Sequence, residues 1–126
     1  PEPTAPPYQF VVKESSDFET SHPNFDIYVA VVDSANKPLS DYRLVGTHSS
    51  GLRQESRPSA SDWTENSGAM HYKAGNIKYE AFNSPAGVWT LQLVDPSGLP
   101  AAAPVEFPFD PNQPTWYFIV FERQSG

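Results

Sequence analysis

The residue types best suited to acid–base or metal chemistry in this chain are three histidines, His22, His48 and His71. No two of them form an i, i+4 pair or a His-x-His motif, so a shared site would require the fold to gather them. The chain contains no cysteine, which excludes thiolate zinc sites, cysteine nucleophiles and disulfide frameworks. We therefore expect each histidine to be an isolated surface or strand-end residue, with no cofactor bound.

Hydrolytic chemistry has two possible sources in the sequence. Residues 47–51 combine His48 with two serines, but a histidine so close in sequence to its serine rarely has the geometry for proton transfer, and no Gly-x-Ser-x-Gly motif occurs. Paired carboxylates such as Asp62 with Glu65, or Asp17 with Glu19, are the groups that glycoside cleavage uses, but only across a cleft. We expect a non-catalytic protein, with a small hydrolase as an alternative.

Oxygen ligands for a hard cation such as calcium occur in three turn segments, residues 33–36, 62–66 and 110–112. None of them has the spacing of an EF-hand loop. Asp and Asn side chains in turns are equally explained by hydrogen bonds to their own backbone. The sequence leaves open whether these turns bind calcium.

Residues 49–68 form a long polar segment with a single large aromatic residue, Trp63. A loop of this length without a strand of its own is uncommon and is usually functional or disordered. Trp63 could stack on a sugar ring or plug the end of the fold. If the chain binds a ligand, we expect Trp63 to be the stacking ring and Asp62, Arg57 and Asn66 to be polar contacts.

The elements that must position these residues are strands. Short segments rich in β-branched and aromatic residues alternate with Pro, Gly, Asn, Asp and Ser clusters, which is typical of all-β proteins. We expect strands at 9–13, 25–33, 42–48, 70–73, 77–83, 87–94, 105–109 and 116–123. No segment has the period of a helix, so we expect less than about a tenth of the chain to be helical.

Alternation along the strands assigns their faces. Trp89, Leu91 and Leu93 share one face of their strand, which indicates a half-buried strand with Trp89 in the core. Both faces of the strand at 116–123 are bulky and apolar. Because two such faces cannot both face water without an apolar patch, we expect one to be covered by the chain's own loops or N-terminal segment, a second copy or a neighbouring domain.

Composition restricts the partners. Eight Lys plus Arg against fifteen Asp plus Glu give a formal net charge of −7, so nucleic-acid binding lacks its main driving force. No apolar run could span a bilayer, and no signal-peptide pattern is present. Prolines fill four of the first seven positions, which predicts an extended linker at 1–7. We expect residues 8–126 to form a single domain excised from a longer protein.

Two motifs carry a family resemblance. Residues 31–45, VVDSANKPLSDYRLV, and residues 85–95, PAGVWTLQLVD, resemble segments of bacterial immunoglobulin-like or transthyretin-like modules, which often contain a D-x-x-G-x-P-L turn. Asn36 replaces the usual glycine and is compatible with it, because Asn also adopts left-handed backbone. The resemblance implies an all-β sandwich of seven or eight antiparallel strands.

Residues 116–123 also resemble the closing strand of these modules. Together the matched segments cover about a third of the chain and say more about fold than about function, since such modules serve as spacers, adhesion domains and sugar binders alike. The absence of cysteine favours a secreted or cell-surface location, where an unpaired thiol is reactive. We therefore expect a structural or protein-interaction module whose partners are neighbouring domains of the same chain or another protein. The alternative is a carbohydrate-binding module that uses exposed aromatic residues around Trp63.

Overall fold

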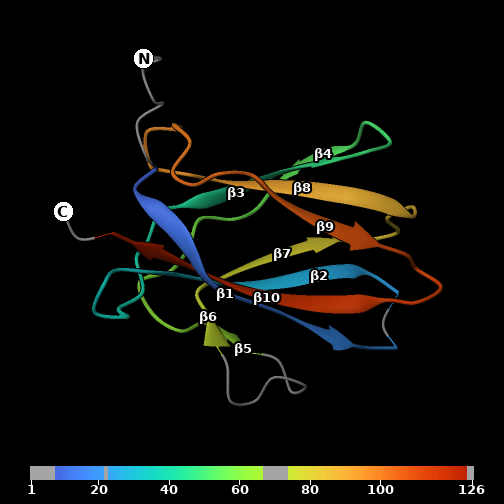
Figure 1. Cartoon of the computed structure of the whole chain (residues 1–126), viewed down its shortest axis with the longest axis horizontal. Helices are drawn as coiled ribbons and strands as arrows, with labels where there is room; N and C mark the ends of the chain where they lie inside the picture. Colours follow the sequence, from blue (N-terminus) through green and yellow to red (C-terminus); the bar gives the residue numbers. More distant parts are fainter. Residues whose placement is uncertain (1–7, 22, 67–73, 125–126) are drawn as a thin grey trace, which may run out of the picture.

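A computed structural model describes residues 8–21, 23–66 and 74–124 of the chain. Two four-stranded sheets lie face to face, and a two-stranded hairpin lies below one of them (Figure 1). The described residues contain no helix, and hence none long and apolar enough to cross a membrane. The strands are β1 (Phe10–Glu19), β2 (Phe25–Val32), β3 (Arg43–His48), β4 (Arg53–Glu55), β5 (Glu65–Asn66), β6 (Ala74–Gly75), β7 (Ile77–Ala81), β8 (Gly87–Val94), β9 (Val105–Phe109) and β10 (Thr115–Arg123).

The predicted all-β sandwich is confirmed. One sheet has the order β1-β10-β2-β7 and the other the order β4-β3-β8-β9, with the small hairpin β5-β6 outside them. One pairing differs from the expected antiparallel arrangement, because β10 inserts between β1 and β2 and runs parallel to β2. A parallel pair needs a long crossover connection, and here almost the whole chain separates the two strands.

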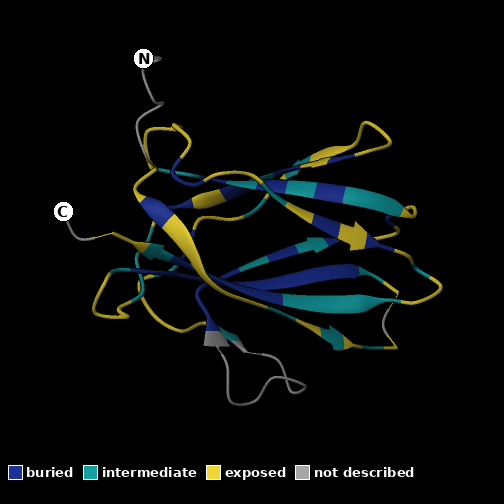
Figure 2. Cartoon of the chain, viewed as in Figure 1, coloured by how far each residue is buried: buried dark blue, intermediate teal, exposed yellow. Residues whose placement is uncertain are grey.

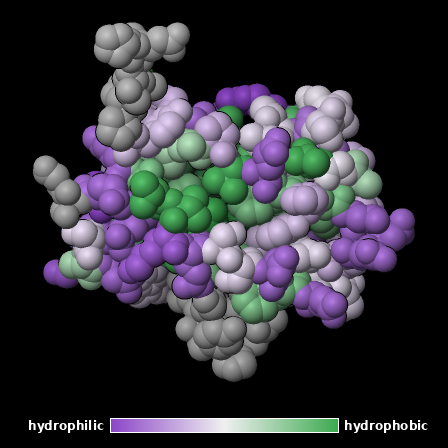
Figure 3. All heavy atoms as spheres, in the orientation of Figure 1, coloured by the Kyte–Doolittle hydropathy of each residue, from purple (hydrophilic) through white to green (hydrophobic). Residues whose placement is uncertain are grey.

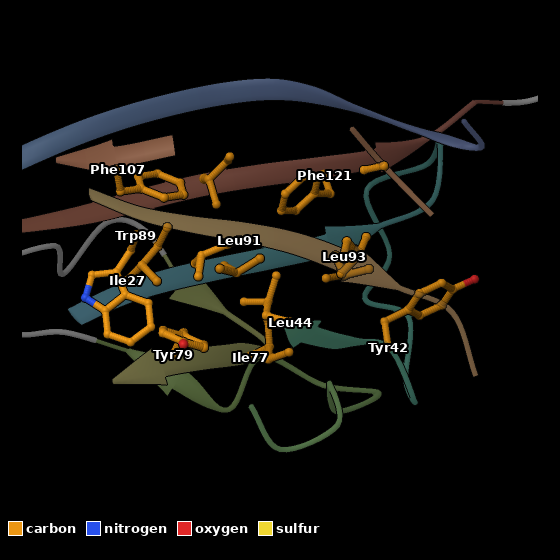
Figure 4. Close-up of a cluster of buried hydrophobic side chains, with 14 of the residues drawn as sticks. Ile27, Tyr42, Leu44, Ile77, Tyr79, Trp89, Leu91, Leu93, Phe107 and Phe121 are labelled. Carbon is orange, nitrogen blue, oxygen red and sulfur yellow. The ribbon is translucent and has the colours of Figure 1, made fainter. Parts of the chain in front are cut away.

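The core between the sheets is rich in aromatic residues. Figure 4 shows the inward side chains of both sheets filling this space, Trp89 among them. The Phe25 ring stacks on Trp89 with centroids 5.7 Å apart, and Tyr79 meets Trp89 edge-on at 5.6 Å. The indole N–H of Trp89 donates a hydrogen bond to Ser84 Oγ at 2.9 Å, so its one polar atom is satisfied in the core.

A second apolar cluster lies on the outer face of the sheet that contains β10. Tyr28, Ala30 and Val32 of β2 and Phe118 and Val120 of β10 form it, and all five are buried. Figure 2 shows β2 buried along its whole length. Strand β6 contacts β2 and lies on this side of the sheet (Figure 1). The prediction that one face of the closing strand is covered is therefore confirmed within the chain itself.

Two matching turns end β2 and β8. In each, an aspartate Oδ1 accepts backbone N–H bonds from residues two and four positions later, as Asp33 does from Ala35 and Lys37 and Asp95 from Ser97 and Leu99. Isolated bridges, Val32 to Pro38 and Val94 to Pro100, close both turns. The fourth position has positive φ in each, 63° at Asn36 and 87° at Gly98, which explains why Asn and Gly are interchangeable there.

Most predicted strands occur where the pattern placed them, with two kinds of exception. Strand β1 continues through residues 14–19, which are polar apart from Phe18, because β10 supplies its hydrogen-bond partners and its edge position allows polar side chains on both faces. The short strands β4, β5 and β6 were not predicted. The expected strand at 70–73 and the expected linker at 1–7 lie outside the described residues.

Candidate functional site

The long polar segment 49–68 is not a single strandless loop, contrary to prediction. It contains strand β4, which pairs with β3, and strand β5 at 65–66. The residues between them are held by serine side chains that replace strand hydrogen bonds. Ser56 Oγ accepts the N–H of Leu44 at 2.8 Å, and Ser59 Oγ accepts the N–H of Tyr42 at 3.0 Å and donates to the Leu39 carbonyl at 2.6 Å.

Asn76, which is 1% exposed, anchors the same segment through hydrogen bonds of its side chain. Its Oδ1 accepts the N–H of Val31 at 2.8 Å, and its Nδ2 donates to the carbonyls of Val31, Leu39 and Ala60 at 3.0–3.1 Å. One side chain thus joins β2, the turn that follows it and the segment leading to β5. This polar network is fully satisfied, which makes the wall it supports rigid.

A polar groove runs along the open side of the sandwich where β4 and β7 form the edges of the two sheets. Its volume is about 470 Å³, within the range of ligand sites. Gln54 Nε2 donates a hydrogen bond to the Glu80 carbonyl and ties the two edges together. The groove is lined by Gln54, Glu55, Ser56, Arg57, Pro58, Ala60, Thr64, Glu65, Asn76, Ile77, Lys78, Glu80 and Phe82.

Of the four predicted ligand-binding residues, Arg57 alone lines this groove. Trp63 is 38% exposed and belongs to neither core cluster, so it does not plug the sandwich. Asp62 is exposed, and its Oδ1 accepts the N–H of Trp63 at 2.8 Å. These two residues directly precede Thr64, which lines the groove. Asn66 ends β5, where its backbone pairs with Ala74.

Charged groups continue from the groove onto the covered outer face of the sheet. Lys78 Nζ lies 3.7 Å from Glu80 Oε1 and 5.2 Å from the centre of the Tyr28 ring. Asp26, directly opposite Glu80 across the β2–β7 pair, is 3% exposed. Burial and the adjacent Glu80 carboxyl raise the pKa of Asp26 to about 7, against the opposing effects of Lys78 and the Trp116 indole.

His48 is the one histidine among the described residues, and it is a buried strand-end residue. Its Nδ1 lies 2.8 Å from Ser50 Oγ and accepts the Ser50 backbone N–H at 3.0 Å. Its ring packs edge-on against Trp89 at 5.1 Å. The hydroxyl and the backbone N–H of Ser50 thus both bind the Nδ1 of His48, and these hydrogen bonds cap the turn after β3. This capping accounts for the contact between His48 and Ser50 without a catalytic role. His22 and His71 lie outside the described residues.

Each of the three segments considered for calcium has an aspartate that accepts a backbone hydrogen bond. Oδ1 of Asp33, Asp62 and Asp110 each accepts one or more N–H groups from residues one to four positions later. In the part of the chain that the structure describes, no three His, Asp or Glu side chains gather into a group that could hold a metal ion.

An apolar surface lies on the opposite side of the sandwich, where β1 and β9 are the edge strands. Figure 3 shows it as a green region where β1 begins and where the segment between β8 and β9 passes. Val11 and Val12 are 46% and 43% exposed there. The surface contains a depression of about 340 Å³ lined by Tyr8, Phe10, Val11, Val12, Ala102, Ala103, Pro104 and Val105, which we call the apolar pocket.

Sequence reasoning missed this pocket, although a signal for it was present. Two adjacent valines cannot both face the core from a regular strand, so Val11 with Val12 at the start of a strand implies an exposed apolar side chain. Sequence reasoning also missed the buried Asp26. The signal for this residue was an acidic side chain inside an otherwise apolar strand.

Comparisons with known proteins add no assignment: no protein-family model matches the sequence, and a search of curated proteins found no match.

Proposed function

We propose that this chain is a non-catalytic protein-interaction module, of immunoglobulin-like or transthyretin-like type, within a larger secreted or cell-surface protein. The observation that carries the proposal is the apolar pocket at the β1–β9 side. Contiguous exposed apolar side chains around a concave surface mark contact sites for other proteins. The partner is a neighbouring domain of the same chain or a separate protein.

The pocket has the features that favour contact with a protein segment. Its base is rigid, because the Phe10 N–H donates to the Ala101 carbonyl at 3.0 Å and the Phe10 ring meets Tyr42 edge-on at 5.0 Å in the core. Val11, Val12 and Pro104 surround that base with exposed apolar atoms. A partner side chain that covers them gains hydrophobic burial without any rearrangement of the fold.

The experiment that tests this proposal is selection of random twelve-residue peptides against the immobilised chain. Selected peptides are measured against Val11→Ser/Val12→Ser and against Leu52→Ser, a matched control that removes an apolar side chain 49% exposed on another part of the surface. Burying the exposed parts of the Val11 and Val12 side chains under a peptide contributes about 2 kcal/mol to binding, or roughly 30-fold in affinity. We expect that loss in the valine variant alone. Equal binding to all three proteins would refute the interaction surface.

A second candidate function, carbohydrate binding, is favoured by the β4–β7 groove. Phe82 lines it and is 68% exposed, and Trp63, which is 38% exposed, directly precedes the lining residue Thr64. Arg57, Thr64 and Gln54 add hydrogen-bonding groups along its length. Aromatic faces together with polar groups on a rigid wall are what a sugar chain requires.

Calorimetry with soluble polysaccharides distinguishes the two functions. Stacking on an aromatic ring contributes about 1–2 kcal/mol, so Trp63→Ala and Phe82→Ala should each weaken glycan binding about tenfold, while Val11→Ser/Val12→Ser should leave it unchanged. No binding to any polysaccharide would remove this candidate. If Trp63→Ala abolishes glycan binding and the peptide selection yields no binder, carbohydrate binding replaces protein interaction as the proposed function.

A further inference from the structure

The apolar pocket continues into an acidic one along the same edge of the sandwich. A second depression, of about 200 Å³, is lined by Ser15, Ser16, Asp17, Val105, Glu106, Phe107 and Tyr117, and we call it the acidic notch. Val105 lines both depressions. An occupant of the apolar pocket that extends along the edge therefore meets carboxylates next.

A bulge in β1 places Asp17 in the notch. The register to β10 shifts between Val12 and Glu14, so that Val12 lies opposite Phe121 and Asp17 lies opposite Tyr117. Phe121 and Tyr117 are on the core-facing side of β10. Val12 and Asp17 therefore belong to the same side of β1, the side that faces β9, and both are exposed because the sandwich is open there.

The carboxylates of the notch are not neutralised by the described residues. Asp17 and Glu106 take part in none of their ion pairs, whereas Lys13, the nearest cation on β1, pairs with Glu122 at 3.0 Å. Glu19 on β1 adds a further exposed acidic side chain to this edge. The whole chain carries a net charge of −7, so a second copy would be repelled from this edge and a basic segment attracted.

Resting on the proposed function, we propose that the partner is an extended peptide segment with an apolar side chain for the apolar pocket and a Lys or Arg side chain for the acidic notch. Charge complementarity selects this occupant. The two positions on β10 that face Val12 and Asp17 are four residues apart, about 13 Å along a strand. An extended partner spans that distance in four residues, and an even spacing puts both side chains on one face.

The test uses labelled ten-residue peptides and fluorescence anisotropy at low salt. One peptide carries Leu and Arg four positions apart, a second carries Leu and Glu, a third Ser and Arg, and each is made in both chain directions. The proteins are the native chain, Asp17→Lys/Glu106→Lys and Val11→Ser/Val12→Ser. Glu55→Lys/Glu65→Lys is the matched control, since it changes net charge equally in the β4–β7 groove.

We expect the Leu/Arg peptide to bind the native chain about tenfold more tightly than the Leu/Glu peptide, from two exposed charge contacts. The notch variant should reverse this preference, and the control should keep it. Two results would overturn the inference. One is equal affinity of the native chain for the Leu/Arg and Leu/Glu peptides, and the other is an unchanged preference in the notch variant. If both peptides bind equally and both lose affinity in Val11→Ser/Val12→Ser, the acidic notch is excluded while the proposed interaction function stands.

Discussion

Replacing Asp26 by asparagine should make the protein more stable at alkaline pH. Asp26 lies on β2, buried on the outer face of its sheet and opposite Glu80 on β7. One Asp26 oxygen, Oδ1, lacks a well-formed hydrogen bond. Two carboxylates directly across an antiparallel pair repel each other when both are ionised. Asparagine keeps the shape of the side chain, cannot ionise and can donate a hydrogen bond to Glu80.

The sign and the size of the change in the free energy of unfolding follow from the raised pKa of Asp26. Unfolded Asp26 loses its proton near 3.8, whereas the folded protein keeps it until about pH 7, because burial and Glu80 oppose ionisation. Between these values the unfolded state binds fewer protons, so the free energy of unfolding falls as pH rises and levels off above about pH 7. A shift of about three pKa units sets a ceiling of about 4 kcal/mol on the loss.

Urea unfolding from pH 4.5 to 9, followed by tryptophan fluorescence, measures the difference. We expect Asp26→Asn to match the native chain near pH 4.5 and to exceed its free energy of unfolding by about 2–4 kcal/mol at pH 8. Asp62→Asn is the matched control, because it removes one carboxylate from an exposed position. Parallel pH profiles for the native chain and Asp26→Asn would refute the reasoning.

Three further substitutions test the fold. Asn76→Ala removes the side chain that binds the Val31 N–H and the Ala60 carbonyl, whereas the Val31 and Leu39 carbonyls keep the Leu39 N–H and the Ser59 hydroxyl, and should cost about 2–4 kcal/mol in urea unfolding; a loss below 1 kcal/mol would contradict the anchoring role. Gly46→Ala would place its Cβ against the Tyr79 hydroxyl and should cost about 3 kcal/mol, with part of the loss recovered in a Tyr79→Phe background; additive effects would count against this contact. Hydrogen bonds from Ser97 and from backbone N–H groups lower the pKa of Asp95, so its contribution is present above about pH 4 and lost as pH falls. Asp95→Ala should therefore lower the melting temperature at pH 6 and change it little at pH 2.5, and an equal change at both pH values would exclude this explanation.

The fold class and most strand positions could be predicted because each strand carries its own alternation. In β8, Trp89, Leu91 and Leu93 face the core as predicted, since a side-chain period of two is a local property of the chain. The turn at Asp33 also formed as its sequence indicated, because an Asx turn is closed by atoms only a few residues apart.

The candidate sites could be predicted only in part. Arg57 lines the β4–β7 groove as proposed for a ligand contact, but Lys78, Glu80 and Phe82 come from β7 and join it across the open side of the sandwich. Nothing local in the sequence brings these residues to Arg57. The serine and asparagine side chains that hold the intervening segment also act over distances of 12 to 45 residues in the chain.

The sequence by itself determined an acidic, cysteine-free chain of short alternating strands with Asx turns, because composition and local periodicity need no knowledge of what lies across the fold. Tertiary structure alone decided the insertion of β10 parallel to β2, the burial of Asp26 beside Glu80, and the meeting of Val12 and Asp17 with Val105 at one edge. These contacts join residues far apart in the chain. Their formation depends on the packing of the two sheets, which fixes the strand order and leaves the sides of the sandwich open.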